Sequence, residues 1–551
     1  MEKDTAHDEG TEVAAEIDAN TSNEASDKET SNEEAPQNES PQYVTGIKLW
    51  TLLASITLIV FLVMLDMSII AIPRITNQFH SLQDVGWYGS AYLLASCSLQ
   101  PLTGKIYSLF STKITYMAFL ALFEVGSALC GAAQSSKMLI VGRAVAGLGV
   151  AGLSNGAMTI ISASAPLHKR PALIGIMMSI SQLGIIGGPL IGGALTQYAS
   201  WRWCTVGFFI NLPVGAVSSI ILILIKFPDD AAKAARRVKL ADFDFPGFVL
   251  FAGFAIMFLL ALEWGGTVYP WKSAIIIGLF CGSGGVLAIF AAWEIRVGDN
   301  AMIPPGMVRK RVVWSACLVI AFFFGALLCF TYYLPIYFQA VKGVSPSLSG
   351  VYVLPGILSQ ILMATVSGVL VGVWGYYLPW SIASSILVSI SAGLLSTLAP
   401  HTSTAEWVIY QMIGGFGRGA GLQMPIVAVQ NNLPREQNAV GMALIMFCQT
   451  FGGSLFLSFA QTIFDHSLIA SLHKYAPAVN SEAGVSAGAT AFRGIVNDAD
   501  LPGVLRAYSV AIDHNFYLAA GASVGAFVCC WGMGWKKITK EKPKKSNAFN
   551  A

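Results

Sequence analysis

The sequence predicts an all-α polytopic membrane protein, and two observations carry this prediction. Fifty-four per cent of the 551 residues are hydrophobic and only 12% are charged, whereas about 25% of the residues in an average soluble chain are charged. The apolar residues gather in runs of about 20, the length that crosses a bilayer core as a helix. This composition excludes a multidomain soluble enzyme. The nine cysteines lie within or at the end of apolar runs, without zinc-finger spacing.

Fourteen apolar runs match the length of a transmembrane helix. The predicted spans are 49–72, 87–107, 114–132, 138–165, 173–196, 204–225, 245–264, 274–293, 312–338, 348–373, 378–398, 407–429, 439–464 and 516–533. The connections that lie on the N-terminal side of the membrane hold 14 Lys and Arg, against 5 in the short connections of the other side. Because basic residues concentrate in cytoplasmic loops, both termini are expected to be cytoplasmic.

The chain also contains an internal repeat. Residues 172–182 and 439–449 both run from Ala to Gln through apolar residues, and glycines follow each. Two six-helix halves with two inserted helices explain this repeat, which is typical of transporters that rock about a central site. The expected segments are a disordered acidic tail 1–47, an N-terminal half 48–225, a linker 226–310 with the two extra helices, a C-terminal half 311–533 with an external loop 465–515, and a basic tail 534–551. The loop either caps the external mouth or is a passive linker.

Three charged residues inside the spans are candidates for proton coupling, since an intramembrane charge is costly and is a functional candidate by default. Asp66 in span 1 and Arg143 in span 4 are expected at ~8–10 Å below the same membrane surface. We interpret Asp66 as the proton-exchanging group and Arg143 as the charge that tunes its proton affinity. The alternative is a structural tie. Glu124 in span 3 is the third candidate, with a helix–helix contact as its alternative; Glu263 and Glu294 are expected at the interface.

Several motifs of the first half carry a family resemblance. Gly-Lys-Ile-Tyr-Ser-Leu-Phe-Ser-Thr-Lys occupies 104–113, Gly-Arg-Ala-Val-Ala-Gly occupies 142–147, and Gly-Ile-Ile-Gly-Gly-Pro-Leu-Ile-Gly-Gly occupies 184–193. With the segment around Asp66, they resemble the 14-span drug:proton antiporters of the major facilitator superfamily, and most closely the fungal toxin-efflux branch, over about residues 45–535. The resemblance implies the major facilitator fold and conformational roles for Gly104, Lys105, Lys113, Gly147, Gly184, Gly188, Pro189, Gly192 and Gly193.

The glycine motif of span 5 also has a mechanical interpretation. Gly184, Gly188 and Gly192 recur every four residues and so share one helix face, which lets a neighbouring backbone approach closely. Pro189 removes one backbone hydrogen bond and bends the span. Close packing alone would produce the same pattern.

The loop motif departs from the family pattern. The position that is usually Asp in the family is Ser108 here, and a later glycine is Ser111. In the family this Asp pairs with basic residues and latches the two halves. A different latch is therefore expected in this chain.

The resemblance also implies which spans line the substrate cavity. Their polar and aromatic residues at membrane depth are Tyr92, Gln100, Asn155, Gln182, Tyr332, Tyr333, Tyr352, Arg418, Gln423 and Gln449. Aromatic and amide side chains suit bulky, mostly apolar compounds better than sugars, although interhelical hydrogen bonding explains any single residue equally well. Arg418 either faces the cavity or mirrors the polar site of span 4.

These observations predict a proton-coupled exporter of a hydrophobic toxin, metabolite or drug. Siderophore–iron uptake and vacuolar transport of basic amino acids are the alternatives within the superfamily. The chain has no phosphate-binding loop, and its two Gly-x-Ser-x-Gly matches lie within apolar spans, so neither an ATP-driven pump nor a hydrolase is expected.

We expect no cofactor or metal, with the proton gradient as energy source. The expected partners are lipid, substrate and protons, without nucleic acid or an obligate protein partner. Toxin export favours the plasma membrane over the vacuolar membrane.

Overall fold

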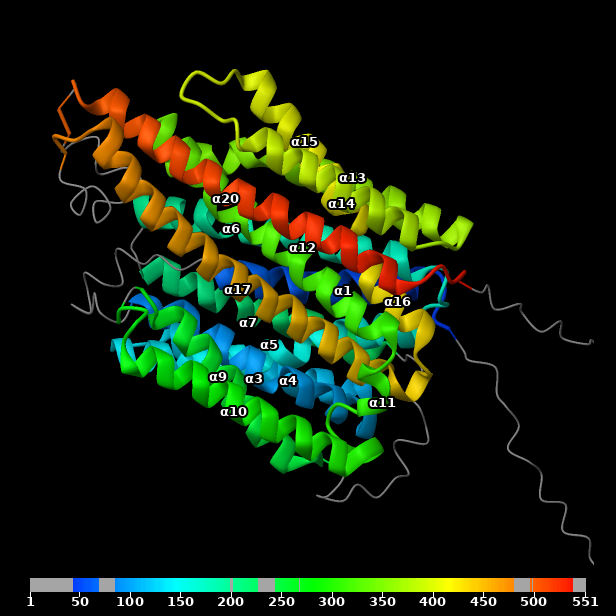
Figure 1. Ribbon diagram of the computed structural model, residues 1–551. Coiled ribbons are helices and arrows are strands. Elements are labelled where there is room, and N and C mark those ends of the chain that lie inside the picture. Colours follow the sequence, from blue (N-terminus) through cyan, green and yellow to red (C-terminus); the bar gives the residue numbers. More distant parts are fainter. Residues whose placement is uncertain are drawn as a thin grey trace, which may run out of the picture. The chain divides into compact units, whose positions relative to one another are not determined.

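The described part of the chain forms helices that run alongside one another (Figure 1). The computed structural model describes residues 43–68, 85–198, 202–225, 243–266, 268–479, 496–497 and 499–538. The tails that the sequence predicts fall mostly outside these residues. Residues 1–42 of the acidic tail and residues 539–551 of the basic tail are not among those described.

Within the described residues, six helices form the first part of the fold, and a pair of helices follows them. Their bounds are α1 (Ile47–Ser68), α3 (Val85–Leu109), α4 (Thr112–Gly131), α5 (Ser136–Ser164), α6 (Arg170–Tyr198), α7 (Arg202–Leu224), α9 (Phe245–Trp264) and α10 (Ala274–Val297). A short connection then carries the 3-10 turn Gly298–Asn300 and α11 (Pro305–Val308).

The remaining helices follow this connection. Their bounds are α12 (Arg311–Ile336), the π-helical turn Tyr337–Val341, α13 (Pro346–Trp374), α14 (Leu378–Leu395), α15 (Thr404–Gly421), α16 (Met424–Asn432), α17 (Arg435–Tyr475), α20 (Leu501–Cys530) and the 3-10 turn Trp531–Met533.

Length and apolar composition make most of these helices suitable for a membrane. Within the described residues, ten helices are long and apolar enough to cross a bilayer, namely α1, α4, α5, α9, α10, α12, α13, α14, α17 and α20. Shorter apolar stretches lie in α6 and α7. The prediction of an all-α polytopic membrane protein is therefore confirmed.

Two predicted boundaries differ from the structure. Both ends of the expected external loop 465–515 are helical, because α17 continues to Tyr475 and α20 begins at Leu501. These extensions pack on each other: Ser467 and His514 are hydrogen bonded at 2.6 Å, and Tyr508 is buried. Polar residues end the apolar runs of both helices in this segment, but α17 and α20 continue to pack on each other beyond those runs. The twelfth predicted span is also divided, since α15 ends at Gly421 and α16 starts at Met424, directly before Pro425.

The helices pack in an order that brings distant parts of the sequence together. α9 and α10 pack on each other, and α9 packs on α3 at one edge of the bundle, whereas α13, α14 and α15 pack together at the opposite edge (Figure 1). α3 packs against α17, and α6 packs against α13. These two contacts join the first six helices to the helices that follow the inserted pair.

Glycines set the spacing between α5 and its neighbours. A Cβ at Gly149 would lie 2.5 Å from the Phe123 backbone nitrogen of α4, and a Cβ at Gly126 would lie 2.5 Å from the Ala146 Cα of α5. Gly147 lies equally close to the Tyr92 backbone of α3. Helix pairs in membranes associate through such close approach, because lipid supplies no hydrophobic force between helices. α5 is consequently held tightly between α3 and α4.

We expect Gly149→Leu to destabilise the fold, because the new side chain must push α4 away from α5. Overpacking of this kind costs about 1–3 kcal/mol. Thermal melting of the purified protein in detergent measures the effect as a lower melting temperature. Gly285→Leu on α10 is the matched control, since nothing lies within 4 Å of a Cβ at Gly285; equal melting temperatures for the two variants would contradict the packing argument.

Candidate functional site

A buried ion pair joins Asp66 of α1 to Arg143 of α5. Arg143 Nη1 donates to Asp66 Oδ2 at 2.6 Å and to the Asp66 carbonyl oxygen at 3.2 Å, and both side chains are only 1% exposed. Arg143 Nε donates to the Tyr88 carbonyl oxygen of α3 at 2.9 Å. The guanidinium group also lies over the Tyr92 ring, 4.2 Å from its centroid. The two residues thus form an ion pair, and α3 supplies the surroundings of the pair.

Asn211 of α7 completes the surroundings of the Asp66 carboxylate. Its Nδ2 donates to Asp66 Oδ1 at 3.3 Å and to the Ser127 hydroxyl of α4 at 3.0 Å. A buried ion pair stabilises a fold only when further hydrogen bonds satisfy its remaining oxygens and protons. Arg143, Asn211 and the Tyr88 carbonyl meet this requirement for Asp66 and its partner.

Glu124 of α4 lies one helical turn before Ser127 but has a different environment. Both of its carboxylate oxygens are buried, and neither has a hydrogen-bond partner among the described residues. The carboxylate faces Gly215 of α7, where a Cβ would collide with Oε1. A buried carboxylate without a partner costs much more free energy when it is charged than when it is protonated. The two acids therefore differ: Asp66 forms an ion pair with Arg143, whereas Glu124 has no hydrogen-bond partner among the described residues.

Lysines of the loop motif bind backbone carbonyl groups. Lys105 Nζ donates to the carbonyl oxygens of Asn300 and Ala301 at 3.0 and 3.3 Å, whereas Lys113 Nζ donates to those of Ile223 and Ile225 at 2.6 and 3.2 Å. Carbonyl groups at helix ends lack intrahelical partners and attract cations. Lys113 thus ties α4 to the end of α7, and Lys105 ties α3 to the connection after α10.

Ser108 does not replace the missing Asp of the loop motif. Its hydroxyl donates to the Lys105 carbonyl oxygen within the same helix, at 2.7 Å. The link between α3 and the following parts of the chain is made by the Lys105 ammonium group instead. The contact between Lys105 and residues 300–301 is therefore our candidate for the different latch that the sequence predicts.

Two acids hold this connection in place. Asp244, which caps α9, accepts hydrogen bonds from the backbone nitrogens of Gly247 and Met302 at 3.1 and 2.9 Å and from Trp293 Nε1 at 2.7 Å. Glu294 accepts one from the Ile303 backbone nitrogen at 2.9 Å. Glu294 thus has a structural place at the end of α10. The inserted helices present a rigid segment to Lys105 of α3.

The contact between α3 and α17 differs at its two ends, which we call the Lys105 end and the Trp271 end. At the Lys105 end a Cβ on Gly104 would lie 2.7 Å from the Val440 Cα, and one on Gly368 of α13 would lie 2.6 Å from the Ala172 Cα of α6. The helices touch there without space for a ligand. Toward the Trp271 end, α3 and α17 separate and a cavity lies between them.

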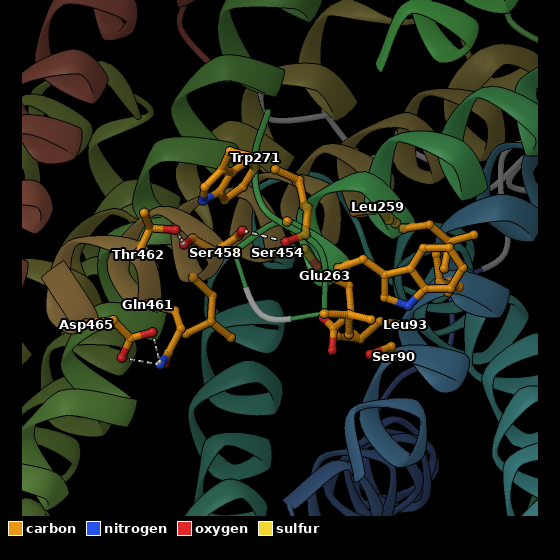
Figure 2. Close-up of a pocket in the computed structure, with 18 of the residues that line it drawn as sticks. Ser90, Leu93, Leu259, Glu263, Trp271, Ser454, Ser458, Gln461, Thr462 and Asp465 are labelled. Carbon is orange, nitrogen blue, oxygen red and sulfur yellow. Dashed lines mark hydrogen bonds between the residues drawn. The ribbon is translucent and has the colours of Figure 1, made fainter. Parts of the chain in front are cut away.

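This cavity has a volume of 460 Å³ and is lined by α3, α9 and α17 (Figure 2). Its walls are mainly apolar and include Trp87, Trp264 and Trp271. Figure 2 shows Glu263 beside Ser90 on one side, and Asp465 with Gln461 on the other. Gln461 Nε2 donates to both Asp465 carboxylate oxygens at 3.0 and 3.1 Å. The volume is in the range of small-molecule sites, which are typically apolar with a few convergent polar groups.

Comparison with known proteins identifies the family. Residues 55–457 match the sequence profile of the Major Facilitator Superfamily. The chain belongs to this superfamily. It is therefore a multi-pass membrane transporter that acts on small molecules, and not an enzyme.

The relatives refine this assignment. The chain is 57% identical over 519 residues to "Efflux pump mlcE" of Penicillium citrinum, covering 92% of this chain and 93% of that protein. It is 59% identical over 505 residues to "Efflux pump mokI" of Monascus pilosus, covering 89% and 92%, and 54% identical over 546 residues to "MFS-type transporter pigP" of Monascus ruber, covering 98% and 95%. The resemblance to fungal efflux transporters is thus confirmed.

A solved structure supports the fold. The proton:xylose symporter XylE superposes with a TM-score of 0.57 at 14% identity, covering 88% of this chain and 95% of that chain. At this level of identity the match concerns the helix arrangement alone. It confirms the major facilitator fold.

The residues predicted to line the substrate cavity occupy several different places. None of them lines the cavity at the Trp271 end. Tyr92 lies under Arg143, Asn155 donates to the Thr103 hydroxyl at 3.1 Å, and Gln423 donates to the Ala364 carbonyl oxygen and the Ser367 hydroxyl at 3.2 and 3.0 Å. Interhelical hydrogen bonding is thus the observed contact of the last two.

The other predicted cavity residues divide into buried and accessible ones. Gln100, Gln182 and Gln449 are buried, and the side-chain oxygens of Gln100 and Gln449 have no partner among the described residues. Tyr333 donates to Gln461 Oε1 at 3.3 Å and so contacts the wall of the cavity, whereas its neighbour Tyr332 is 46% exposed.

Tyr352 and Arg418 lie in the second half. Tyr352 stacks on Trp407, with ring centroids 5.0 Å apart. Arg418 lies among α12, α13 and α15 and donates to Gln360 Oε1 at 3.1 Å.

The glycine motif of α6 is described in part. A Cβ at Gly184 would lie 2.5 Å from the Phe61 carbonyl oxygen of α1, so this position does allow a close approach of two backbones. α6 continues as a helix through Gly188, Pro189, Gly192 and Gly193 to Tyr198. The side chains of residues 189–198 are outside the described part of the chain.

Sequence reasoning missed Asn211 and the cavity. Asn211 carries a recognisable signal, because it is an amide inside the apolar run of span 6. The cavity has no such signal, since its wall combines the end of an inserted helix with residues of α3 and α17.

We expect Asp66→Asn and Arg143→Gln each to destabilise the protein by about 3–5 kcal/mol, because each leaves a buried charge or its hydrogen-bonding partners unpaired. The double variant should lose clearly less than the sum of the two. Chemical or thermal unfolding of all four proteins in detergent measures this coupling. Additive losses would show that the two groups do not stabilise each other.

We expect Lys105→Ala to loosen the Lys105 end. Losing about 1 kcal/mol of hydrogen bonding changes a conformational equilibrium about fivefold. The readout is maleimide labelling of the thiol introduced by Ala443→Cys, beside Gly104, in a background whose native cysteines are replaced. Labelling should accelerate with Lys105→Ala but not with Lys113→Ala, since the carbonyl groups that Lys113 binds belong to residues 223 and 225 at the end of α7; acceleration by both would argue against a specific latch.

Proposed function

We propose that the protein is a proton-coupled efflux transporter, an antiporter that exports hydrophobic small molecules such as a toxin, secondary metabolite or drug by alternating access. The observation that carries this proposal is the buried site of Asp66, Arg143 and Glu124 inside a major facilitator fold. The names of the relatives, two of them efflux pumps, favour export over the uptake of siderophores or the transport of basic amino acids.

The same proposal includes fourteen spans with both termini in the cytoplasm. Ten of the spans are the helices that are long and apolar enough by themselves. The other four are α3, α6, α7 and the pair of α15 and α16, which together make one span. The excess of Lys and Arg in the connections at the Lys105 end makes that end cytoplasmic. The plasma membrane is the location that fits export from the cell.

The structure then corresponds to an outward-facing state. The Lys105 end is closed by the contacts of Gly104 and Gly368, and the cavity lies toward the Trp271 end. Rocking of the two halves would open the Lys105 end and close the other. The Lys105 contact with residues 300–301 holds the closed cytoplasmic end until that motion occurs.

Proton exchange takes place at the site of Asp66, Arg143 and Glu124. In the state described, Arg143 neutralises Asp66, and Glu124 is neutral when it carries the proton. Release of that proton adds a second negative charge near the Asp66 carboxylate, and the two acids then repel each other. Because α1, α4 and α5 carry these three residues, the change in charge acts directly on the packing of the first half. One charge that crosses 100 mV yields about 2.3 kcal/mol, enough to sustain a substrate ratio approaching two orders of magnitude.

We expect Glu124→Gln to abolish uphill export, because glutamine fills the same volume and cannot release a proton. Cells that make the protein should accumulate less of a hydrophobic dye, and an uncoupler should remove this difference. The variant should show at least a tenfold loss of uncoupler-sensitive export, yet keep dye-for-dye exchange, which requires no net proton movement.

Glu406→Gln is the matched control. Glu406 caps α15 outside the proton site, where it accepts a hydrogen bond from the Ser403 backbone nitrogen that glutamine can also accept. Its export should equal that of the natural protein. Uncoupler-sensitive uphill export by Glu124→Gln, at normal surface abundance, would remove Glu124 from the coupling mechanism.

A further inference from the structure

Arg418 is a cation within the membrane-spanning part of α15 that has no acidic partner among the described residues. Its Nε donates to Gln360 Oε1 of α13 at 3.1 Å, and its guanidinium carbon lies 5.1 Å from the centroid of the Phe330 ring in α12. No carboxylate among the described residues forms an ion pair with it. A charged side chain in this position is expensive to insert, and such residues usually mark a binding site or an ion pathway.

The buried arginine of the first half provides a comparison for Arg418. In the first half, Arg143 pairs with Asp66, the twentieth residue of α1. The twentieth residue of α12, which opens the second half, is Phe330, and Phe330 is the ring that lies against Arg418. The second half thus also has an arginine within a spanning helix, although Arg418 is the fifteenth residue of α15 whereas Arg143 is the eighth of α5, and its neighbour is an aromatic ring and not an acid.

Glycines leave room around the guanidinium group. A Cβ at Gly356 of α13 would lie 3.3 Å from Arg418 Nη2, and a Cβ at Gly414 would lie 3.2 Å from Nη1. Gln360 and Phe330 are buried, whereas Arg418 itself keeps partial exposure. The two outer nitrogens thus remain as donors without a protein acceptor in the described part of the chain.

We propose that Arg418 binds the carboxylate of the exported molecule, so that the transported class is amphipathic organic acids. A carboxylate matches the planar fork of a guanidinium group with two parallel hydrogen bonds. The Gln360 amide can donate beside it, and Phe330 offers an apolar wall to the body of the molecule. The substrate carboxylate would thus neutralise Arg418, as the Asp66 carboxylate neutralises Arg143.

This inference rests on the proposed export function and adds a consequence for its energetics. At neutral pH a carboxylic acid is ionised, since carboxyl groups of this kind titrate near pH 4. Exchange of one outgoing anion for one incoming proton moves two charges in the same electrical sense. The membrane potential then drives export of the acid twice as strongly as export of a neutral compound.

The test compares an acid with its uncharged ester. The full-length protein, purified in detergent, is titrated with 1-pyrenebutyric acid and with its methyl ester at pH 7, and binding is followed by pyrene fluorescence. The natural protein should bind the acid more tightly than the ester. Arg418→Gln should weaken binding of the acid about tenfold to a hundredfold, the usual effect of losing a charge-assisted hydrogen bond, and leave binding of the ester unchanged.

Two further variants separate recognition from folding. Arg418→Lys keeps the charge but not the fork and should give an intermediate affinity for the acid. Arg435→Gln, the same substitution outside the site, should behave as the natural protein. If Arg418→Gln does not fold, Arg418→Lys replaces it in the test. The proposal is then overturned if the ratio of the affinity for the acid to the affinity for the ester is the same in Arg418→Lys as in the natural protein.

Other outcomes overturn it as well. Failure of the natural protein to prefer the acid, which includes failure to bind either compound, contradicts carboxylate recognition. Equal loss of both compounds in Arg418→Gln shows a structural role only. The proposed export function is tested separately, by dye accumulation in cells. It is contradicted if an uncoupler does not change that accumulation, so the failure of one proposal can be told from the failure of the other.

Discussion

The structure depends above all on how buried charges are compensated in an apolar surrounding. Asp66 and Arg143 are almost completely buried, and they are stable there because each satisfies the other and because Asn211 and the Tyr88 carbonyl take the remaining hydrogen bonds. Helices α1, α3, α5 and α7 must hold their relative positions to maintain this set. The ion pair therefore fixes the arrangement of the first half while it places a carboxylate within the membrane.

Glu124 and Arg418 depart from this compensation. Glu124 has no hydrogen-bond partner in the described part of the chain, and Arg418 has no acid. Each is costly as a charged group, so each is more easily explained by a transported species than by the stability of the fold. A proton neutralises Glu124, and an anionic substrate neutralises Arg418. The two halves would thus bind the two transported species separately, the proton in the first half and the anion in the second.

The inserted helices contribute to both ends of the bundle. At one end, Asp244 and Glu294 hold the segment that Lys105 binds. At the other end, α9 supplies a wall of the cavity between α3 and α17. The inserted helices thereby contact helices of both halves, and in the proposed mechanism the contact of Lys105 with residues 300–301 serves as the latch in place of the missing loop-motif Asp.

The sequence by itself determined the helical membrane fold, the family and the charged residues worth attention, and it predicted the repeat. These follow from composition, from apolar runs of fixed length and from motifs, all of which are local in the chain. Only the tertiary structure decided that Asp66 is paired, that Glu124 is not, and that Lys105 binds carbonyl groups of a segment almost 200 residues away. The physical reason is that compensation of a charge depends on which helices are neighbours and how they are rotated. Apolar runs of similar length and hydropathy do not encode that rotation.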